Sequence, residues 1–392
     1  MSQVPFLSQP LALGDLTLKN RNIMASLTRN RNVPTNVPND IVKEYYVQRA
    51  RGGASLILSE GTLVAQQGTE WPHAPGIWSE EQVAAWRKIT DAVHEAGAYM
   101  FCQLWHVGRV SHPDMPEQKA AGKPVPAPSA IAAYGGKFRQ LPGEPGYVTP
   151  TAVKDPWTIV EEFRHAAKMA KKAGFDGVDL HSANGYLPHQ FLDYSANQRT
   201  DQWGGSVENR CRFGLEVIKA MVDVWGPARV GIKVSPCGGY NDVGMPLPDT
   251  LATFNHYITE LASLKLAYIQ IVRYSYFTDA PARVKPGEPQ PEGGKPWLRG
   301  VPHDVFDKLN PTPTRLLVNG GVTPQEAEAY IKDGVVDAAV FGVMWIANPD
   351  FHTRLEKGLA VNTQPDFVTF HHGVGDDTKA GYTTYPFAEE SS

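Results

Sequence analysis

Cysteine is scarce in this chain, and the spacing of its cysteines excludes several kinds of protein. The 392 residues contain three cysteines, Cys102, Cys211 and Cys237, and no CxxC pair. Three separated cysteines cannot form a full disulfide framework, and without CxxC pairs a structural zinc site or an iron–sulfur cluster is not expected. We therefore expect no metal site and a reducing, cytoplasmic location.

Long apolar runs and an excess of one charge are also missing. No segment reaches the ~18 consecutive apolar residues that a transmembrane helix needs, and the N-terminus lacks the basic and apolar regions of a signal peptide. The 41 acidic and 37 basic residues leave a formal net charge of -4. This charge gives no reason to expect nucleic acid or an acidic membrane as a partner.

The chain does contain a series of short apolar segments separated by helical patterns. We predict eight strands, at residues 22–25, 55–59, 99–104, 177–181, 230–235, 268–272, 315–319 and 337–341. Eight strands that alternate with helices are typical of the α/β class and of a closed TIM (β/α)8 barrel. The alternative, an open doubly wound sheet, normally carries a GxGxxG fingerprint, and the chain has none. We therefore favour the barrel.

Local signals mark the ends of several predicted helices. Ser79-Glu-Glu-Gln82 is a capping-box pattern that predicts a helix to about His94, and Thr323-Pro-Gln-Glu326 predicts a second helix to about Asp333. Apolar residues at helical spacing predict a third helix over 156–172. Each of the three is followed by a glycine that can end it: Gly97, Gly334 and Gly174.

Four segments do not fit a bare barrel, although we expect residues 1–392 to form one domain. Residues 11–18 alternate around Gly14-Asp15 and predict a β-hairpin lid at the N-terminal mouth of the barrel. Residues 106–155 hold eight prolines and are too irregular for a helix, so we expect a loop excursion over the active-site face. Residues 273–300 predict a second excursion on that face and a candidate lid. We expect residues 360–392 to form a C-terminal extension.

The residues at the C-terminal ends of the strands form the active site in TIM barrels. In this chain those positions hold Ser26, Leu27, Thr28, Glu60, Gly61, Gln103, Trp105, His181, Asn184, Lys233, Asn319, Gly320, Gly342 and Val343. Thr28 and Gln103 can hydrogen-bond the edge of a heteroaromatic ring, and Lys233 offers positive charge. The glycines after the last two strands leave backbone N–H groups open to a phosphate.

The segment from His181 to Leu187 carries the clearest chemical signal. His181 and Asn184 can donate hydrogen bonds to one carbonyl oxygen, and the Tyr186 phenol can deliver a proton beside it. Such a set suits the reduction of a carbon–carbon double bond conjugated to a carbonyl group. Taken alone, a histidine at a strand end is usually a satisfied polar residue, and a tyrosine is more often a packed aromatic than an acid. Asparagine also favours turns.

Five segments together resemble the old yellow enzyme family of FMN-dependent ene-reductases over almost the whole chain. They are Met24-Ala-Ser-Leu-Thr-Arg29, Gln103-Leu-Trp-His-Val-Gly-Arg109, His181-Ser-Ala-Asn-Gly-Tyr-Leu187, residues 197–210, and Ile346-Ala-Asn-Pro-Asp350. Their order and spacing are those of the family. Within the fourth segment we expect a structural ion-pair network: Arg199, Asp201, Glu208 and Arg210.

The resemblance implies FMN as cofactor, NADPH or NADH as electron donor, and a small electrophilic alkene as substrate, in a monomer or homodimer. Hydride would pass from the nicotinamide to the flavin and then to the β-carbon of the alkene. Tyr186 would protonate the α-carbon, while His181 and Asn184 would hold the carbonyl or nitro oxygen. The residues implied around FMN are Ser26, Leu27, Thr28, Gly61, Gln103, His181, Lys233, Asn319, Gly320, Gly342 and Val343. Those implied around the substrate are Trp105, His181, Asn184, Tyr186, Phe370 and His371.

The chain departs from the family pattern at several of these positions. Lys233 stands where many relatives have arginine, Ser26 replaces a common proline, and His371 replaces a common tyrosine. At Val343 relatives usually have an arginine that binds the FMN phosphate. Two alternatives stay open: a flavin barrel that binds FMN poorly, and another FMN oxidoreductase, such as a 2-hydroxy-acid dehydrogenase or oxidase. The second would need arginines that bind a carboxylate, and the strand ends supply few.

The replacement at Val343 predicts weaker FMN retention than is usual for the family. Only backbone donors remain obvious at this position, and they lack the charge of a guanidinium. Equilibrium dialysis of FMN against the purified protein measures this retention. An undiminished affinity, with no other cation at the phosphate, would contradict the prediction.

Overall fold

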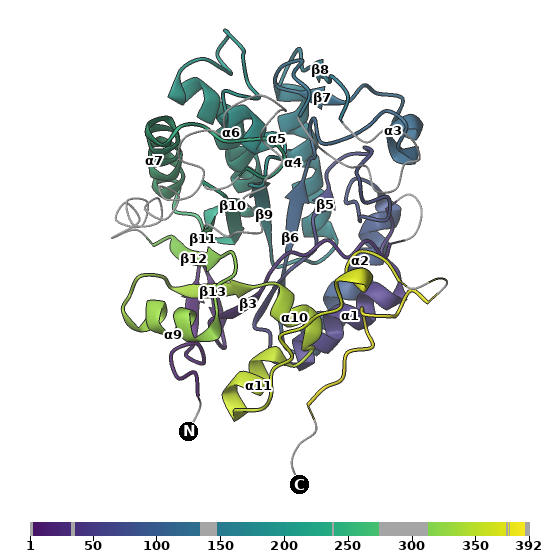
Figure 1. Ribbon diagram of the computed structural model, residues 1–392, viewed down its shortest axis with the longest axis vertical. Helices are drawn as coiled ribbons and strands as arrows, with labels where there is room; N and C mark the ends of the chain where they lie inside the picture. The colour runs from purple at the N-terminus through teal and green to yellow at the C-terminus, as the bar shows by residue number, and fades with distance from the viewer. Residues whose placement is uncertain are drawn as a thin grey trace, which may run out of the picture.

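A computed structural model describes residues 3–32, 36–133, 147–236, 239–273, 313–373, 375 and 377–388. Parallel strands lie at its centre and helices surround them (Figure 1). The first barrel strand, β3 (Asn22–Met24), lies beside the last, β13 (Ala338–Phe341), and pairs with it in parallel. The first and the last strand of the barrel are therefore neighbours in the same sheet.

Hydrogen bonds between strands close this sheet into a barrel. The parallel strands follow the order β4-β3-β13-β12-β11-β10-β9-β6, and pairing between β4 and β6 joins the two ends. The remaining bounds are β4 (Leu56–Leu58), β6 (Tyr99–Trp105), β9 (Gly177–Ser182), β10 (Val230–Val234), β11 (Tyr268–Val272) and β12 (Arg315–Asn319), with β5 (Thr62–Leu63) added against β6. The predicted TIM barrel is confirmed, and each predicted strand is found within about one residue of its expected ends.

Helices follow most of the strands and cover the outside of the barrel. They are α1 (Asp40–Arg51), α2 (Glu80–Glu95), α3 (Pro116–Ala121), α4 (Trp157–Lys172), α5 (Leu187–Leu192), α6 (Val207–Trp225), α7 (Leu247–Ser263), α9 (Pro324–Lys332), α10 (Val343–Ala347) and α11 (Phe351–Lys357), with 3-10 turns η1 (Pro227–Arg229) and η4 (Phe367–Thr369). Both predicted capping boxes are formed, by Ser79 with Gln82 and by Thr323 with Glu326. The sequence signals for these helix starts are therefore confirmed.

The predicted hairpin is formed by β1 (Leu11–Leu13) and β2 (Leu16–Leu18), which pair antiparallel. The leucines of the hairpin are buried in one cluster with strand residues that include Phe101 and Tyr268. A neighbouring cluster holds the residues that alternate with them, such as Cys102 and Ile269. Because side chains alternate along a strand, the first cluster fills the inside of the barrel and the second joins its outer wall to the helices.

The excursion at 106–155 contains more regular structure than expected. Residues Pro116–Ala121 form the short helix α3, and β7 (Pro126–Ala127) pairs in parallel with β8 (Thr151–Ala152). The prediction that this stretch is too irregular for a helix is wrong, because Pro116 occupies the first helical turn, where its missing N–H costs no bond. Of the second predicted excursion, 273–300, all residues except Arg273 lie outside the described part of the chain.

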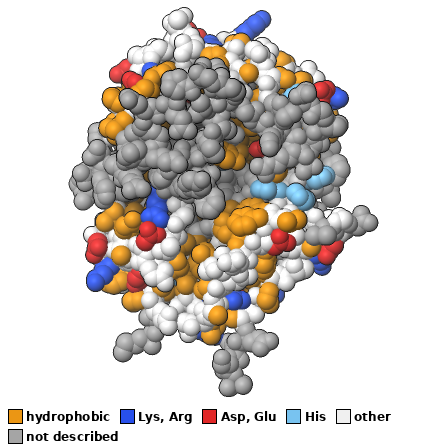
Figure 2. Space-filling view, in the orientation of Figure 1, with side chains coloured by type: hydrophobic (Ala, Val, Ile, Leu, Met, Phe, Trp, Pro, Cys, Tyr) orange, Lys and Arg blue, Asp and Glu red, His pale blue; other side chains and the backbone are white. Residues whose placement is uncertain are grey.

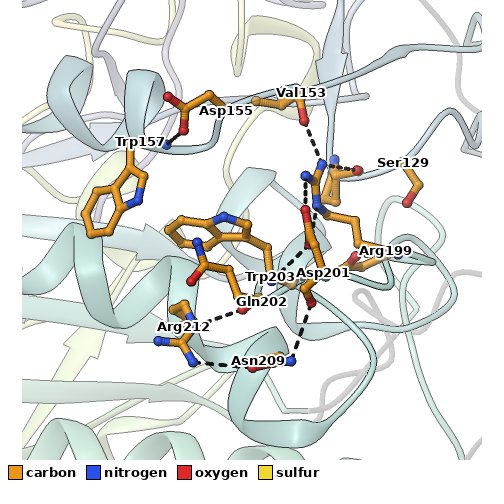
Figure 3. A network of polar contacts seen from close by, with 12 residues as sticks. Ser129, Val153, Asp155, Trp157, Arg199, Asp201, Gln202, Trp203, Asn209 and Arg212 are labelled. Atoms are coloured by element: carbon orange, nitrogen blue, oxygen red, sulfur yellow. Dashed lines mark hydrogen bonds and ion pairs between the residues drawn. The ribbon is translucent and has the colours of Figure 1, made fainter.

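Arg199 ties the segment before α6 to the first excursion by a hydrogen bond, and it forms an ion pair within its own segment (Figure 3). Arg199 binds both carboxylate oxygens of Asp201 and donates to the Val153 carbonyl at 2.6 Å. The predicted pairing of Arg199 with Asp201 is confirmed. Arg210 instead donates to the carbonyl of Leu192 and to the Thr253 hydroxyl, and no ion pair joins it to Glu208 in the described structure. A buried arginine is satisfied here by neutral acceptors, which sequence spacing does not reveal.

Among the described helices, none is long and apolar enough to cross a membrane. Cys102 and Cys211 are buried free thiols, whereas Cys237 lies outside the described residues.

Candidate active site

A cavity of about 520 Å³ opens where the carboxyl ends of the barrel strands meet. Every residue that the sequence suggested around a cofactor or substrate lines it: Ser26, Leu27, Thr28, Gly61, Gln103, Trp105, His181, Asn184, Tyr186, Lys233, Asn319, Gly320, Gly342, Val343, Phe370 and His371. Figure 2 shows hydrophobic and histidine side chains next to each other near the middle of the face that it presents. The volume is that of a small-molecule site.

His181 lies at the end of β9 with its ring facing the cavity. Burial lowers the pKa of this imidazole well below its usual value, and the positive charge of Lys233 lowers it further. The ring is therefore neutral at physiological pH, so one nitrogen carries a proton and the other can only accept. Its buried Nδ1 atom has no protein partner among the described residues.

The turn after β9 fixes Asn184 and Tyr186 beside this histidine. The Asn184 backbone has a left-handed φ of 56°, its N–H donates to Ser235 at 2.8 Å, and its carbonyl accepts from Asn241. The Tyr186 and His181 rings pack edge to face, with their centroids 4.9 Å apart. Burial raises the pKa of the Tyr186 phenol well above 10, so its hydroxyl keeps its proton at neutral pH. These residues therefore combine a neutral donor and a weak acid at one wall of the cavity.

A buried carboxylate, which sequence reasoning missed, supports the base of the site. Asp179 lies two residues before His181, on the same face of β9, and accepts hydrogen bonds from Gln103 Nε2 at 2.7 Å and from the Tyr268 hydroxyl at 2.9 Å. Burial raises the pKa of Asp179 to about 6, against the opposing effects of these bonds and of Lys233. Because the amide nitrogen of Gln103 faces Asp179, the orientation of the Gln103 side chain is fixed.

Lys233 is the cation of this region. Its side chain is 7% exposed, and burial lowers the pKa of its ammonium group while the charge of Asp179 opposes that change. Among the described residues that line the cavity, Lys233 is the only lysine, and none is an arginine. The positive charge expected at this position is therefore present but is partly balanced by the carboxylate beneath it.

The C-terminal segment forms another wall. The His371 ring stacks on Trp71 with centroids 3.9 Å apart, and its Nδ1 lies 2.8 Å from the Thr28 carbonyl. Arg29 secures the neighbouring residue by donating to the Phe370 carbonyl at 2.9 Å. Trp71 was not predicted, because it lies in a loop before α2 without any periodic pattern. The loop residue Tyr240 also lines the cavity and was missed for the same reason.

One residue of the strand-end set lies elsewhere. Glu60 follows β4 but does not line the cavity. Its carboxylate is buried and accepts from the backbone N–H groups of Arg29 and Asn30 at 3.0 and 3.2 Å. Glu60 thus holds the loop after β3 in shape, a role that position along a strand does not reveal.

The end of the cavity formed after β12 and β13 is polar without being charged. Asn319, Gly320, Gly342 and Val343 line this end, and none of the described lining residues from the loops after β12 and β13 carries a cationic side chain. Val343 is 37% exposed at the start of α10. Backbone N–H groups are therefore the donors available to a phosphate at this end.

Several residues that line the cavity carry polar side-chain atoms without a partner in the described structure. Besides His181 Nδ1, the buried Ser26 Oγ and Trp105 Nε1 atoms have no protein partner in the described structure. Buried polar atoms are normally hydrogen-bonded, and these three belong to residues that line the cavity. A flat heteroaromatic cofactor with a polar edge and a phosphate fits this donor set.

The chain is similar to flavin-dependent reductases in sequence and in structure. A family model described as "NADH:flavin oxidoreductase / NADH oxidase family" matches residues 6–362. An "NADP-dependent oxidoreductase lnbE" from Aspergillus flavus is 40% identical, covering 97% of this chain and 96% of the relative. A "Probable flavin mononucleotide-dependent alkene reductase" from Leishmania infantum is 36% identical over 97% and 96% of the two chains.

Two solved structures resemble the fold over nearly their whole length. Morphinone reductase in complex with tetrahydroNAD superposes with a TM-score of 0.82 at 37% identity, covering 98% of both chains. The old yellow enzyme homologue from Zymomonas mobilis superposes with a TM-score of 0.83 at 33% identity, covering 97% of this chain and 99% of its own.

The raised pKa of Asp179 predicts a pH-dependent loss of stability. The folded chain keeps this proton up to about pH 6, whereas the unfolded chain releases it near the ordinary value of 3.8. Stability from this group is therefore full below about pH 4 and is lost as the pH rises to about 6. In the native chain the free energy of unfolding should fall by an amount on the order of 3 kcal/mol over this pH range, and Asp179→Asn should abolish that fall. Urea unfolding between pH 4 and 7 measures it. Asp91→Asn, on the exposed surface of α2, is the control; parallel profiles for Asp179→Asn and the native chain would contradict the assignment.

Proposed function

We propose that this chain, which belongs to the NADH:flavin oxidoreductase / NADH oxidase family, reduces the carbon–carbon double bond of α,β-unsaturated carbonyl or nitro compounds. It is an FMN-dependent, NAD(P)H-dependent oxidoreductase of the old yellow enzyme type. The observation that carries this proposal is that His181, Asn184 and Tyr186 line one cavity together with the residues assigned to the flavin. The alkene reductase among its relatives supports the same substrate class.

The assignment of cofactor-binding residues rests on the resemblance to the family, and it is supported by the fact that all of them line the same cavity. Thr28, Gly61 and Gln103 would bind the edge of the isoalloxazine, and Lys233 would lie where negative charge develops on the reduced ring. The phosphate would meet the backbone at Asn319, Gly320, Gly342 and Val343. Asp179 supports this arrangement, because it fixes the Gln103 side chain through the 2.7 Å hydrogen bond and its negative charge favours the charged form of Lys233.

The chemistry that bound FMN supplies is hydride transfer, from NADPH or NADH to the flavin and from flavin N5 to the β-carbon of the substrate. Hydride addition builds negative charge on the substrate oxygen, and His181 and Asn184 would stabilise it as preorganised donors, each worth about 2–4 kcal/mol in favourable cases. Because His181 is neutral, it would donate through one N–H without giving up its proton. Tyr186 would then deliver its proton to the α-carbon.

A 2-hydroxy-acid oxidoreductase is the weaker candidate. That chemistry needs arginines that bind a carboxylate, and Lys233 is the one lysine or arginine among the described lining residues. The nicotinamide and the alkene would use the same cavity in turn, which accounts for the missing dinucleotide fingerprint. We place this function in one domain formed by residues 1–392, acting as a monomer or homodimer in the cytoplasm on small molecules rather than on nucleic acid or membranes.

A two-step anaerobic experiment tests the proposal. The FMN-loaded protein should lose its visible flavin absorbance on addition of NADPH or NADH, and cyclohexenone should restore it. A flavin that is bleached but not reoxidised by any of a panel of enones, maleimides and nitroalkenes would contradict the alkene-reductase assignment. Reoxidation by a 2-oxo acid instead would favour the weaker candidate.

The proton donor is tested by Tyr186→Phe. Rapid-mixing spectroscopy should show nearly unchanged flavin reduction and an alkene half-reaction slower by about 10²-fold or more, since a positioned general acid contributes that much. Tyr99→Phe, at the opposite end of the barrel on β6, serves as the control. Unchanged enone turnover in Tyr186→Phe would remove this residue as the acid.

The oxyanion site is tested with a ligand instead of turnover. Phenolates give a long-wavelength charge-transfer band with the flavin of this family, and the double variant His181→Ala with Asn184→Ala should abolish it, because the phenolate loses both donors. The absorbance of the bound flavin itself reports that the variant still holds the cofactor. A band that persists would place the oxyanion site elsewhere.

A further inference from the structure

Arg273, directly after β11, binds the glycine turn that follows β12. Its Nε donates to the Gly320 carbonyl at 3.0 Å, and its Nη2 donates to the Gly321 carbonyl at 2.9 Å. Gly320 and Gly321 both line the cavity, whereas Arg273 is not among the described lining residues. The guanidinium therefore contacts the turn from the side away from the cavity.

The remaining donors of this guanidinium are also used. Nη1 donates to Glu326 Oε1 at 3.1 Å and to the Tyr330 hydroxyl at 3.3 Å, and Nη2 donates to Glu326 Oε2 at 2.9 Å. All five N–H groups of the side chain thus have partners. Arg273 lowers the pKa of Glu326 to about 2, so the ion pair persists at physiological pH. With its donors occupied, Arg273 is not placed to bind a phosphate directly.

Its effect on the turn follows from the geometry of the peptide bond. In a trans peptide unit the carbonyl and the following N–H point in opposite directions. Because the carbonyls of Gly320 and Gly321 point to Arg273, the N–H groups of Gly321 and Val322 point away from it, toward the side where these residues line the cavity. Neither N–H donates to a described residue.

At Gly320 this arrangement requires a glycine. Gly320 has a φ of 100° and Gly321 a φ of 68°. A Cβ atom at Gly320 would lie 2.7 Å from the Arg273 carbonyl oxygen, closer than real Cβ atoms come. Successive N–H groups that converge in such a turn form a site for an anion.

We propose that Arg273 is a positioning residue for the FMN phosphate: by holding the carbonyls of Gly320 and Gly321, it turns the N–H groups of Gly321 and Val322 toward the phosphate. This inference rests on the proposed FMN site. It gives that site fixed backbone donors at the end where Val343 supplies no charge. Glu326 keeps the guanidinium in place from the first turn of α9.

The contribution of the phosphate is measured by comparing FMN with riboflavin, which lacks it. In Arg273→Ala the affinity for FMN should fall about 10-fold or more, because two hydrogen bonds to a charged group lose their alignment, while the affinity for riboflavin should stay unchanged. Flavin fluorescence titration gives both dissociation constants. Arg315→Ala, which breaks an ion pair with Asp337 at the other end of β12, is the matched control and should leave both affinities unchanged.

The outcomes separate the inference from the function beneath it. Equal losses for FMN and riboflavin, or no loss for either, would overturn the role of Arg273. If Arg273→Ala binds neither flavin, the Arg273→Lys variant decides, through the ratio of its dissociation constants for riboflavin and FMN. Lysine keeps the charge but cannot bind both carbonyls and Glu326 together. A ratio that still equals that of the native chain overturns the role, and a reduced preference for FMN supports it. A native chain that binds neither flavin would contradict the proposed function itself.

Discussion

Closure of the sheet is the constraint on which the site depends. Pairing between β4 and β6 joins the two ends of the strand order, so the carboxyl ends of all barrel strands meet around one opening. His181 and Lys233 become neighbours because β9 and β10 pair in register at these residues. Residues from positions 25 to 371 then line one cavity. An open sheet would spread the same strand ends along an edge.

The cavity has two electrostatically different ends, and the fold builds each from different groups. At the end near β9 and β10, Lys233 and Asp179 are buried charges whose burial and mutual attraction oppose each other. At the end near β12 and β13, glycine turns offer backbone donors in place of side-chain charge. Arg273 and Glu326 place their charges behind the turn, where they fix its shape.

The strands and helix starts were predictable because their signals are local. Apolar runs marked the barrel strands, and the side chains at Ser79 and Thr323 formed the expected capping boxes. The rule that strand ends form the site, together with the family motifs, selected residues that line the cavity. Asp179 shares a face with His181, so strand alternation could reveal it, but it lies inside a short apolar segment whose pattern predicts only a strand.

Other residues could not be predicted, because contacts between distant segments decide their roles. Trp71 lines the cavity by stacking on His371, from a loop without any pattern. Glu60 has the position of a site residue, yet it accepts backbone bonds from the loop after β3. The bonds from Arg273 to the glycine turn join positions that have no sequence relation.

The most direct test of the account is a crystal structure of the protein with FMN and a phenolate. The account predicts the flavin ring across this cavity and the phenolate oxygen bound to His181 and Asn184; a flavin bound elsewhere, or an oxygen held by other residues, would contradict it.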